Sequence, residues 1–363
     1  MRRPRNGSEG GHRELSVVPQ RLVLLVPEGY HRVMRLHRYR PIACAAQLGL
    51  VAGVGCNVGE LGRPVPPVEP PVDGSPGKEP SEWIAFDSDG GTFNRDIYII
   101  RADGTGRRRL TTASSVDAQP SFSRDGTKLA FASDRDDGIM QIYMMDLATG
   151  VLTHVTQRPE GAHDPAFAID GTRLGYRSGV SVFTATLDGT DERQVTDGTT
   201  CCAGGPFGAP VFLADGQSTI YDDYNAIYST SGGMARRTVV KPTTGEQSHP
   251  ALSADGSTIV LQSTCVGDDA ARSLWTVPAT GTTDYSCTGG QRVSQTGTDA
   301  THASWGPSNV IVWGSVAGGS NSSSPVPSSL VTWQDGSRRT LTSGNADDRN
   351  PSWSPTGTVI GTW

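Results

Sequence analysis

The chain has 363 residues, of which 35 % are hydrophobic and 7 % aromatic, and it contains 45 glycines. This length and composition suit an all-β protein with one large domain and a tail. The formal net charge is −6, which argues against nucleic-acid binding because such a protein would need a basic face.

The N-terminal segment, residues 1–56, reads as an upstream extension followed by a secretory signal. Residues 1–33 fit no fold, and Met34 opens a basic stretch that leads into a run of small apolar residues, 42–55. That run is too short for a membrane span. Its end, Gly53-Val54-Gly55-Cys56, resembles a lipobox, which predicts translation from Met34 and acylation of Cys56 as the first mature residue. Gly53 stands where a lipobox favours leucine, so ordinary signal-peptidase cleavage is the alternative.

Residues 57–82 are dominated by proline, glycine and acidic residues, with a Pro-Val-Pro-Pro run at 64–67. Such a composition predicts a semi-rigid linker without a hydrophobic core. Behind an acylated Cys56, this linker would hold the next domain away from a membrane. We therefore expect an exported bacterial protein that is either periplasmic or anchored in the outer membrane as a lipoprotein. Asn57 favours the outer membrane, because it is not the aspartate that retains lipoproteins at the inner membrane.

Residues 83–363 contain a repeat of about 40 to 50 residues, in which each unit has four short runs of alternating apolar residues. The first run of each unit opens on a proline, or once an alanine, followed two residues later by a bulky apolar side chain: Pro120/Phe122, Pro165/Phe167, Pro210/Phe212, Pro250/Leu252, Ala303/Trp305 and Pro351/Trp353. Five openings lead into a turn that contains glycine: Gly126, Gly171, Gly216, Gly256 and Gly357. Such a glycine supplies the positive φ that a tight hairpin needs. The repeat length and the four strands predict the blades of a β-propeller.

The second unit shows the repeat most clearly. Residues 120–136 read Pro-Ser-Phe-Ser-Arg-Asp-Gly-Thr-Lys-Leu-Ala-Phe-Ala-Ser-Asp-Arg-Asp, and residues 141–146 read Gln-Ile-Tyr-Met-Met-Asp. This pattern resembles the WD-like repeat of the TolB β-propeller family, and the resemblance covers residues 83–363. TolB proteins carry a separate α/β domain before the propeller, whereas this chain has proline-rich sequence there. The resemblance therefore concerns the propeller module alone and does not import the partners of TolB.

The repeats predict an all-β fold, a six-bladed β-propeller of four-stranded antiparallel blades. Five units are complete, and residues 83–111 supply three strands of a sixth blade that lacks its innermost strand. Residues 351–354 supply that strand, so that the ring closes by a velcro and leaves no open sheet edge at the junction. Residues 359–363 read as a further strand that competes with residues 83–86. They either pack outside the ring or begin a partial seventh blade.

The disulfide candidates of this domain are Cys201, Cys202, Cys265 and Cys287, since an exported protein meets an oxidising compartment. No spacing of cysteine with histidine indicates zinc. Blade topology places three of them on one rim, which favours pairing of Cys265 with Cys201 or Cys202. The long loop at 280–290 could also carry Cys287 to a partner, and this alternative stays open.

The sequence has no Gly-x-Ser-x-Gly elbow, no His-Glu-x-x-His, no phosphate-binding loop and no dinucleotide fingerprint. We expect a monomeric, non-enzymatic cell-envelope protein that presents a binding face to a protein, peptide or glycan, and we assign no catalytic residue. The alternative is a metal-dependent polysaccharide lyase. Oligogalacturonate lyases resemble TolB-type propellers and hold their metal with histidine and glutamine at the channel mouth.

The candidate binding site is the channel mouth, formed by the residue that precedes the opening proline or alanine of each unit. These residues are Gln119, Asp164, Ala209, His249, His302 and Asn350, with His163 one position earlier. Equivalent positions of all blades converge on the channel, and five of the six residues are polar, so we expect a polar ligand or partner contact there. His249 and His302, with Gln119 and Asp164, could hold a divalent metal such as manganese or zinc. Otherwise they would hydrogen-bond loop backbones and channel water, and no cofactor is expected.

Overall fold

Blade 2 shows how one repeat folds. Its strands are β4 (Asp117–Phe122), β5 (Lys128–Ser133), β6 (Gln141–Asp146) and β7 (Leu152–His154), paired antiparallel in that order. The turn from β4 to β5 is shaped by Asp125, whose carboxylate accepts hydrogen bonds from Ser123 Oγ at 2.7 Å and from the Thr127 backbone N–H at 3.0 Å. Gly126 in this turn has a φ of 68°, which glycine adopts without strain. The Asp-Gly turn expected from the sequence is therefore present.

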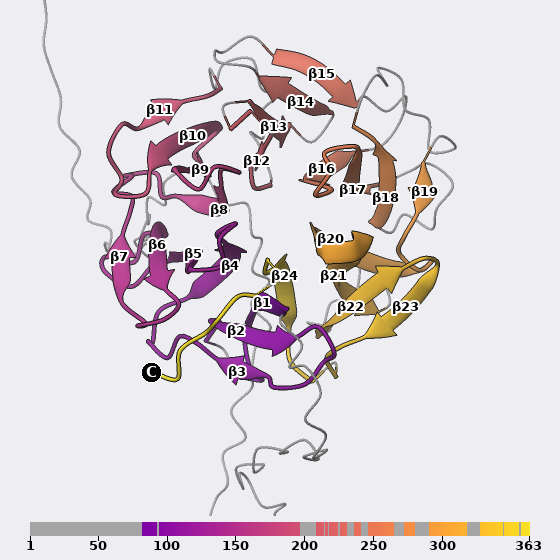
Figure 1. Ribbon diagram of the computed structural model, residues 1–363, viewed down its shortest axis with the longest axis horizontal. Coiled ribbons are helices and arrows are strands. Elements are labelled where there is room, and N and C mark those ends of the chain that lie inside the picture. The colour runs from indigo at the N-terminus through magenta and orange to yellow at the C-terminus, as the bar shows by residue number, and fades with distance from the viewer. Residues whose placement is uncertain are drawn as a thin grey trace, which may run out of the picture. The chain divides into compact units, whose positions relative to one another are not determined.

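Six such sheets are arranged in a ring, which confirms the all-β, six-bladed propeller (Figure 1). The computed structural model describes residues 82–363 apart from gaps at 93, 197–207, 214, 217, 224–225, 231–235, 241–245, 265–271, 280–289, 318–326, 344 and 356. Blade 1 contains β24 (Asp348–Trp353), β1 (Trp83–Ser88), β2 (Asp96–Arg101) and β3 (Arg108–Arg109). Blade 3 contains β8 (His163–Phe167), β9 (Arg173–Ser178), β10 (Ser181–Thr186) and β11 (Arg193–Gln194).

The remaining three blades follow the same order from the innermost strand outward. Blade 4 contains β12 (Val211–Phe212), β13 (Thr219–Asp222), β14 (Ile227–Thr230) and β15 (Arg236–Val240). Blade 5 contains β16 (Gln247–Leu252), β17 (Thr258–Ser263), β18 (Ser273–Pro278) and β19 (Gln291–Arg292). Blade 6 contains β20 (Thr298–Trp305), β21 (Ile311–Ala317), β22 (Ser328–Gln334) and β23 (Ser337–Thr340). A short 3₁₀ turn, η1 (Pro307–Asn309), replaces the Asp-Gly turn in blade 6.

The ring closes by pairing the two ends of the domain, as predicted. Strand β24 lies antiparallel to β1, with Ile84 opposite Trp353 and Ala85 opposite Ser352. The Trp83 backbone N–H also donates to Ser354 Oγ at 2.7 Å. These contacts cover the inner edge of β1, which would otherwise present unpaired backbone groups.

The C-terminal residues 359–363 form no strand, and they do not compete with β1. Instead, the Gly361 backbone N–H and the Trp363 Nε1–H both donate to the Leu147 carbonyl oxygen, at 2.8 and 3.2 Å. The Arg108 guanidinium lies over the Trp363 ring, 6.0 Å from its centroid. The segment therefore lies against blades 1 and 2 outside the sheets, which confirms the first of the two alternatives, and the partial seventh blade is wrong.

Hydrophobic clusters fill the spaces between neighbouring blades. The cluster between blades 1 and 2 contains Ala85, Ile97, Ile99, Leu110, Phe122, Leu129, Phe131, Tyr143, Met145 and Leu147. Each strand contributes side chains from alternate positions, since successive residues of a strand point to opposite faces of the sheet. Removal of apolar surface from water, at roughly 25 cal/mol per Å², makes these clusters the main source of ring stability.

Several expectations fall outside the described residues. They are the signal and start at Met34, the acylation of Cys56, most of the linker 57–82, and the disulfide candidates Cys201, Cys202, Cys265 and Cys287. Within the described part of the chain, no helix has the length and hydrophobicity needed to cross a membrane.

Candidate functional site

The residues of the predicted channel mouth share an unusual backbone conformation. Their φ values are 57° for Gln119, 53° for Asp164, 52° for His249, 48° for His302 and 50° for Asn350. Each lies where the pairing of an inner strand with its neighbour shifts register by a bulge. Positive φ is uncommon for residues other than glycine, and such strained positions cluster at ligand clamps and active sites. Ala209, in the short inner segment of blade 4, does not share the positive φ.

The mouth residues meet at one cavity of about 100 Å³. Its lining comprises Gln119, Asp164, Ala209, His249, His302 and Asn350, together with the proline or alanine that follows each of them except Ala209. The convergence expected from the repeat register is therefore present. His163 is not part of this lining; it lies half-buried at the start of β8, and burial together with Arg177 lowers its pKa. Ligand binding at the mouth stays a prediction.

One half of the mouth is a closed hydrogen-bond network that begins at Gln119. The Gln119 side-chain amide donates to Asp164 Oδ1 and accepts from the Asp164 backbone N–H at 3.1 Å, so both of its polar atoms are engaged. The other carboxylate oxygen of Asp164 accepts from Arg177 Nε at 3.0 Å.

The network continues around the mouth through Asp87, which is buried on β1. Asp87 Oδ1 accepts from the Gln119 backbone N–H at 3.0 Å and from Asn350 Nδ2 at 2.7 Å. Its other oxygen pairs with the Arg95 guanidinium. Burial raises the pKa of Asp87, and Arg95 acts in the opposite direction by favouring the ionised carboxylate.

The other half of the mouth is open. The rings of His249 and His302 meet edge to face, with centroids 4.1 Å apart at an angle of 72°. The Nδ1 atoms of both rings and Oδ1 of Asn350 are buried and have no hydrogen-bond partner within the described part of the protein. Burial, reinforced by the positive charges of Arg349 and Arg272, holds the pKa of His302 well below its usual value, so this ring is neutral at pH 7.

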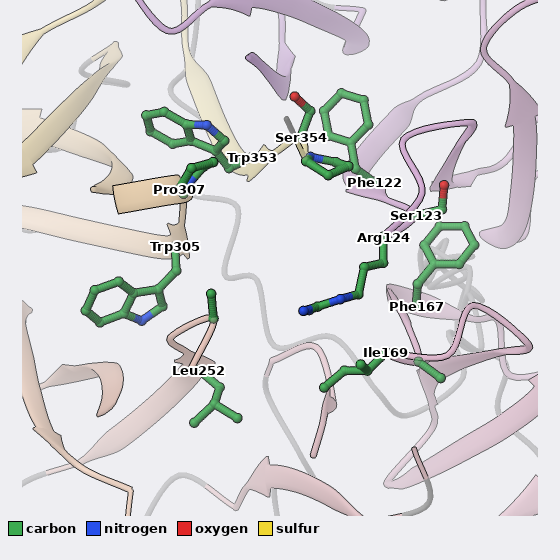
Figure 2. A pocket seen from close by; sticks show the side chains of 14 residues that line it. Phe122, Ser123, Arg124, Phe167, Ile169, Leu252, Trp305, Pro307, Trp353 and Ser354 are labelled. Atoms are coloured by element: carbon green, nitrogen blue, oxygen red, sulfur yellow. The ribbon is translucent and has the colours of Figure 1, made fainter. Parts of the chain in front are cut away.

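Beyond the mouth, the channel widens toward the opposite face of the ring. A chamber of about 350 Å³ is walled by the opening prolines Pro120, Pro165, Pro210, Pro250 and Pro351. It shares lining residues with a third cavity of about 420 Å³, which we call the wide end (Figure 2). The wide end is lined by Phe122, Ser123, Arg124, Phe167, Ala168, Ile169, Leu252, Ala254, Trp305, Gly306, Pro307, Trp353, Ser354 and Pro355.

Among the described residues that line the wide end, Arg124 is the only charged one. Figure 2 shows its side chain extending into the cavity from the side of Phe122 and Phe167, toward Trp305. The side chain is exposed, and no acid or hydrogen-bond acceptor among the described residues pairs with it. The wide end is thus a bowl lined mainly by apolar and aromatic side chains, with one guanidinium that has no partner among the described residues.

Comparison with known proteins relates the first half of this ring to one family. A family model described as the TolB beta propeller domain matches residues 81–211. The Protein TolB homolog of Chlorobium luteolum is 43 % identical over 72 residues, which are 20 % of this chain and 15 % of that protein. The Protein TolB homolog of Chlorobaculum tepidum is 32 % identical over 110 residues, 30 % of this chain and 25 % of that protein. The matched segment spans blades 1 to 3 and the start of blade 4, and over this part the ring is similar to a TolB-type β-propeller.

A solved structure agrees with this assignment at the level of the fold. TolB from Acinetobacter baumannii superposes on the propeller with a TM-score of 0.62 and 19 % identity, covering 78 % of this chain and 69 % of that one. The matched segments span a quarter or less of the two curated relatives. Activity and partners of the whole protein therefore belong to the proposals below.

The donor set at the mouth of the propeller fits a metal poorly. Of the four predicted ligands, Gln119 and Asp164 bond to each other and Asp164 also pairs with Arg177, which leaves the ring nitrogens of His249 and His302 as possible metal ligands. Among the described residues, no group of three or more histidine, cysteine, aspartate or glutamate side chains is placed to hold a metal ion. A metal at His249, His302 and Gln119 stays a prediction from the sequence.

The sequence contains a signal for the wide end that lies outside the catalytic and metal-binding motifs. The residue before the Asp-Gly turn, or its equivalent, is Arg124, Ile169, Ala214, Ala254, Pro307 and Pro355 in blades 2 to 6 and 1. Five of these side chains are apolar and one is a guanidinium. An unmatched charge at a repeat position that is otherwise apolar marks a site where the propeller departs from its own pattern.

Proposed function

We propose that this chain is a non-enzymatic binding protein of the bacterial cell envelope, which captures a segment of a partner protein at the wide end of its propeller. The TolB homologues among its relatives support a role in binding rather than catalysis. As part of this proposal, a secretory signal, acylation of Cys56 and the tether 57–82 would hold the propeller at the outer membrane, facing the periplasm.

The observation that carries this proposal is the unpaired guanidinium of Arg124 inside an apolar bowl. Guanidinium binds carboxylates through two parallel hydrogen bonds, and it is more weakly hydrated than an ammonium group. The surrounding Trp305, Trp353 and Phe167 offer apolar surface to a side chain next to that carboxylate. The bowl therefore fits an acidic residue flanked by aromatic or aliphatic residues.

The dimensions of the wide end favour an extended segment over a folded surface. A cavity of about 420 Å³ has the size of a small-molecule site, which is roughly 300 to 1,000 Å³. It can admit two or three side chains of a peptide, while the rim of the propeller contacts the rest. The rigid, hydrogen-bonded turns that carry Arg124 and Ile169 keep the bowl preorganised, which lowers the entropy lost on binding.

The test uses the full exported chain and short synthetic peptides that place phenylalanine or tryptophan beside glutamate, with glutamine versions as controls. Calorimetry should show saturable binding of the acidic peptides. Arg124→Gln should weaken binding about tenfold or more, because a charge-assisted hydrogen bond contributes roughly 1.5 to 3 kcal/mol. Arg193→Gln is the matched control, since Arg193 is 68 % exposed on the outer strand β11.

Two results would contradict the proposal. Equal binding of the glutamate and glutamine peptides would show that Arg124 does not select a carboxylate. Binding of acidic or neutral oligosaccharides in the absence of peptide binding would make the partner a glycan, and the protein-binding role would be wrong.

A further inference from the structure

The chain enters the propeller at the border of the wide end. The Trp83 backbone N–H donates to Ser354 Oγ at 2.7 Å, and the Ser354 backbone N–H donates to the Trp83 carbonyl oxygen at 2.7 Å. Ser354 lines the wide end together with Arg124 (Figure 2). Residues that precede Trp83 therefore join the ring next to the cavity that holds the unpaired guanidinium.

The turn that carries Arg124 lies beside this entry point. Gly126 in the same turn packs against Pro355 and Thr358, which follow Ser354 in the sequence. Arg124 and the entry point are thus neighbours across one blade junction. The distance that the linker has to span to reach the guanidinium is therefore only that of a single cavity.

The linker contains one carboxylate in the surroundings that the wide end fits. Residues 67–72 read Pro-Val-Glu-Pro-Pro-Val, and Glu69 is the only charged residue among them. Of the five acidic residues in 57–82, Glu69 is the only one with valine or proline on both sides. Asp73 precedes a glycine, and Glu79 follows Lys78, whose charge would oppose a guanidinium.

The composition of residues 67–72 predicts a polyproline II conformation, which has three residues per turn and no internal hydrogen bonds. With this period Glu69 and Val72 share a face, about 9 Å apart along the axis. A segment that is already extended before it binds loses little conformational entropy on binding.

The wide end has walls that suit such a segment. The indoles of Trp305 and Trp353 line one side of the cavity (Figure 2). The phenyl rings of Phe122 and Phe167 line the opposite side, and Arg124 extends between the two. Polyproline II segments dock in aromatic-lined grooves. The cavity therefore offers apolar contact on both sides and one hydrogen-bonding cation between them.

The charges on this face of the ring favour a ligand with a single carboxylate. Arg124 attracts an acid, whereas the aspartates of the neighbouring turns repel one: Asp125, Asp170, Asp215 and Asp255. All four are exposed, and each accepts hydrogen bonds within its own turn, so solvent and salt screen much of their charge. They would still disfavour a polyacidic segment, and Glu69 stands alone among neutral residues.

We propose that residues 67–72, which lie outside the described part of the chain, occupy the wide end of the same molecule when no partner is bound. The Glu69 carboxylate binds the Arg124 guanidinium, and the prolines and valines pack against the aromatic walls. This inference rests on the proposed function, because it takes the wide end to be a peptide site, and it adds the regulation of that site. A partner segment has to displace the chain's own.

The connection is long enough for this contact and short enough to favour it. Residues 73–82, which join the segment to Trp83, can extend over roughly 30 Å at about 3.1 Å per residue, more than one cavity requires. A short tether gives an effective concentration on the order of 1 mM, so even a segment that binds weakly in isolation occupies the site.

The first experiment follows the side-chain Nε–H signal of Arg124 by nuclear magnetic resonance in the full exported chain. Loss of the signal in Arg124→Gln assigns it. Glu69→Gln should shift this signal, because it withdraws the bound carboxylate. Glu60→Gln is the matched control, since it removes one charge from the same linker at a position beside glycine and leucine, and it should leave the signal unchanged.

The second experiment measures binding of the acidic peptides by calorimetry. Glu69→Gln should tighten their binding about tenfold, as expected when a competitor with a dissociation constant of about 0.1 mM is removed from an effective concentration of about 1 mM. Glu60→Gln should have no effect. In the Arg124→Gln background Glu69→Gln should also have no effect, because both residues act through one contact.

The outcomes separate this inference from the proposed function. If Glu69→Gln changes neither the Arg124 signal nor the peptide affinity, the inference is wrong, while peptide binding that depends on Arg124 still supports partner capture. If Glu69→Gln shifts the Arg124 signal but no acidic peptide binds to either protein, the segment occupies the wide end and partner capture there is wrong. A shift that grows with protein concentration would place the linker of a second copy in the cavity and overturn the contact within one chain.

Discussion

The imidazole rings of His249 and His302 lie edge to face with their centroids 4.1 Å apart, although the two residues belong to different blades. Their contact follows from the repeat, because both residues precede the opening residue of an inner strand and both occupy the bulge at which that strand shifts register. The bulge therefore brings the equivalent residue to the channel mouth in the five blades that have it, and blade 4 is the exception. Gly208 closes the site from the side, since a Cβ there would lie 2.9 Å from His249 Cα.

Neutral His302 makes the stability of the propeller depend on pH. Its pKa is lowered in the folded state by burial and by His249, Arg349 and Arg272, so below about pH 6.5 the unfolded chain binds a proton that the folded chain resists. Stability is therefore full above that pH and is lost as the pH falls toward the folded pKa. At pH 5.5 the loss from this group is on the order of 1 kcal/mol.

The measurement compares urea unfolding of the wild-type chain and of His302→Asn at pH 7.5 and pH 5.5. The wild type should lose more stability than the variant over this interval. His163, whose pKa is also lowered, titrates in both proteins and cancels in the comparison. An equal loss in both proteins would show that His302 is not held neutral by the fold.

The sequence was sufficient to predict the ring, the blade strands and the velcro, because these depend on alternating apolar residues and on Asp-Gly turns that repeat along the chain. It also predicted which residues meet at the mouth, since that follows from register alone. It could not predict which of these side chains would find hydrogen-bond partners within the protein. Gln119 and Asp164 bond to each other, whereas His249 and His302 do not find partners, and this depends on side-chain rotamers and on buried charges such as Asp87 and Asp222.

Other features could not be decided from the sequence because they depend on contacts between distant segments. Residues 359–363 have the composition of a strand. They remain outside the sheets because Gly361 bonds to the Leu147 carbonyl and the Trp363 ring packs directly against Gly150. Arg107 pairs with buried Asp348, 241 residues away in the sequence, and lies over the rings of Phe86 and Tyr98.

Two turn glycines with similar backbone angles should respond differently to substitution. Gly189 and Gly171 have φ values of 78° and 70°, but a Cβ on Gly189 would lie 2.1 Å from the Val155 carbonyl oxygen, whereas a Cβ on Gly171 would meet nothing within 4 Å. Gly171→Ala should therefore destabilise by only about 1 kcal/mol, from positive φ alone. Gly189→Ala adds a clash with backbone and should destabilise by roughly 3 kcal/mol or more.

Thermal or urea unfolding of the two variants checks this difference. Each is the control for the other, because both substitutions add one methyl group at a turn with positive φ. Equal destabilisation would mean that the contact between Gly189 and Val155 is not as close as described.

The proposed lipid anchor predicts a defined mature protein. Expression from Met34 in a bacterium should yield a membrane-extracted product that begins at Cys56 and carries the mass of an attached lipid. Cys56→Ser should abolish the lipid and release the protein into the soluble fraction. Intact mass spectrometry distinguishes these forms, and a wild-type product without the added mass would make the lipidation wrong.

The two parts of the C-terminus should contribute very differently to stability. Deletion of residues 359–363 removes the hydrogen bonds of Gly361 and Trp363 to Leu147 and the packing of a partly exposed tryptophan, which should destabilise the ring by about 2 kcal/mol. Deletion of residues 348–363 removes β24 as well, exposes the inner edge of β1 and opens the ring, so it should abolish cooperative folding.

Circular dichroism melts of the two truncated chains test this gradation. Trp363→Ala serves as the matched variant for the shorter deletion, because it removes the ring and keeps the Gly361 hydrogen bond. The melting temperature should fall in the order wild type, Trp363→Ala, deletion of 359–363, with no cooperative transition after deletion of 348–363. A cooperative melt at an unchanged temperature after the longer deletion would show that β24 does not close the ring, because a ring with an open edge cannot retain the stability of a closed one.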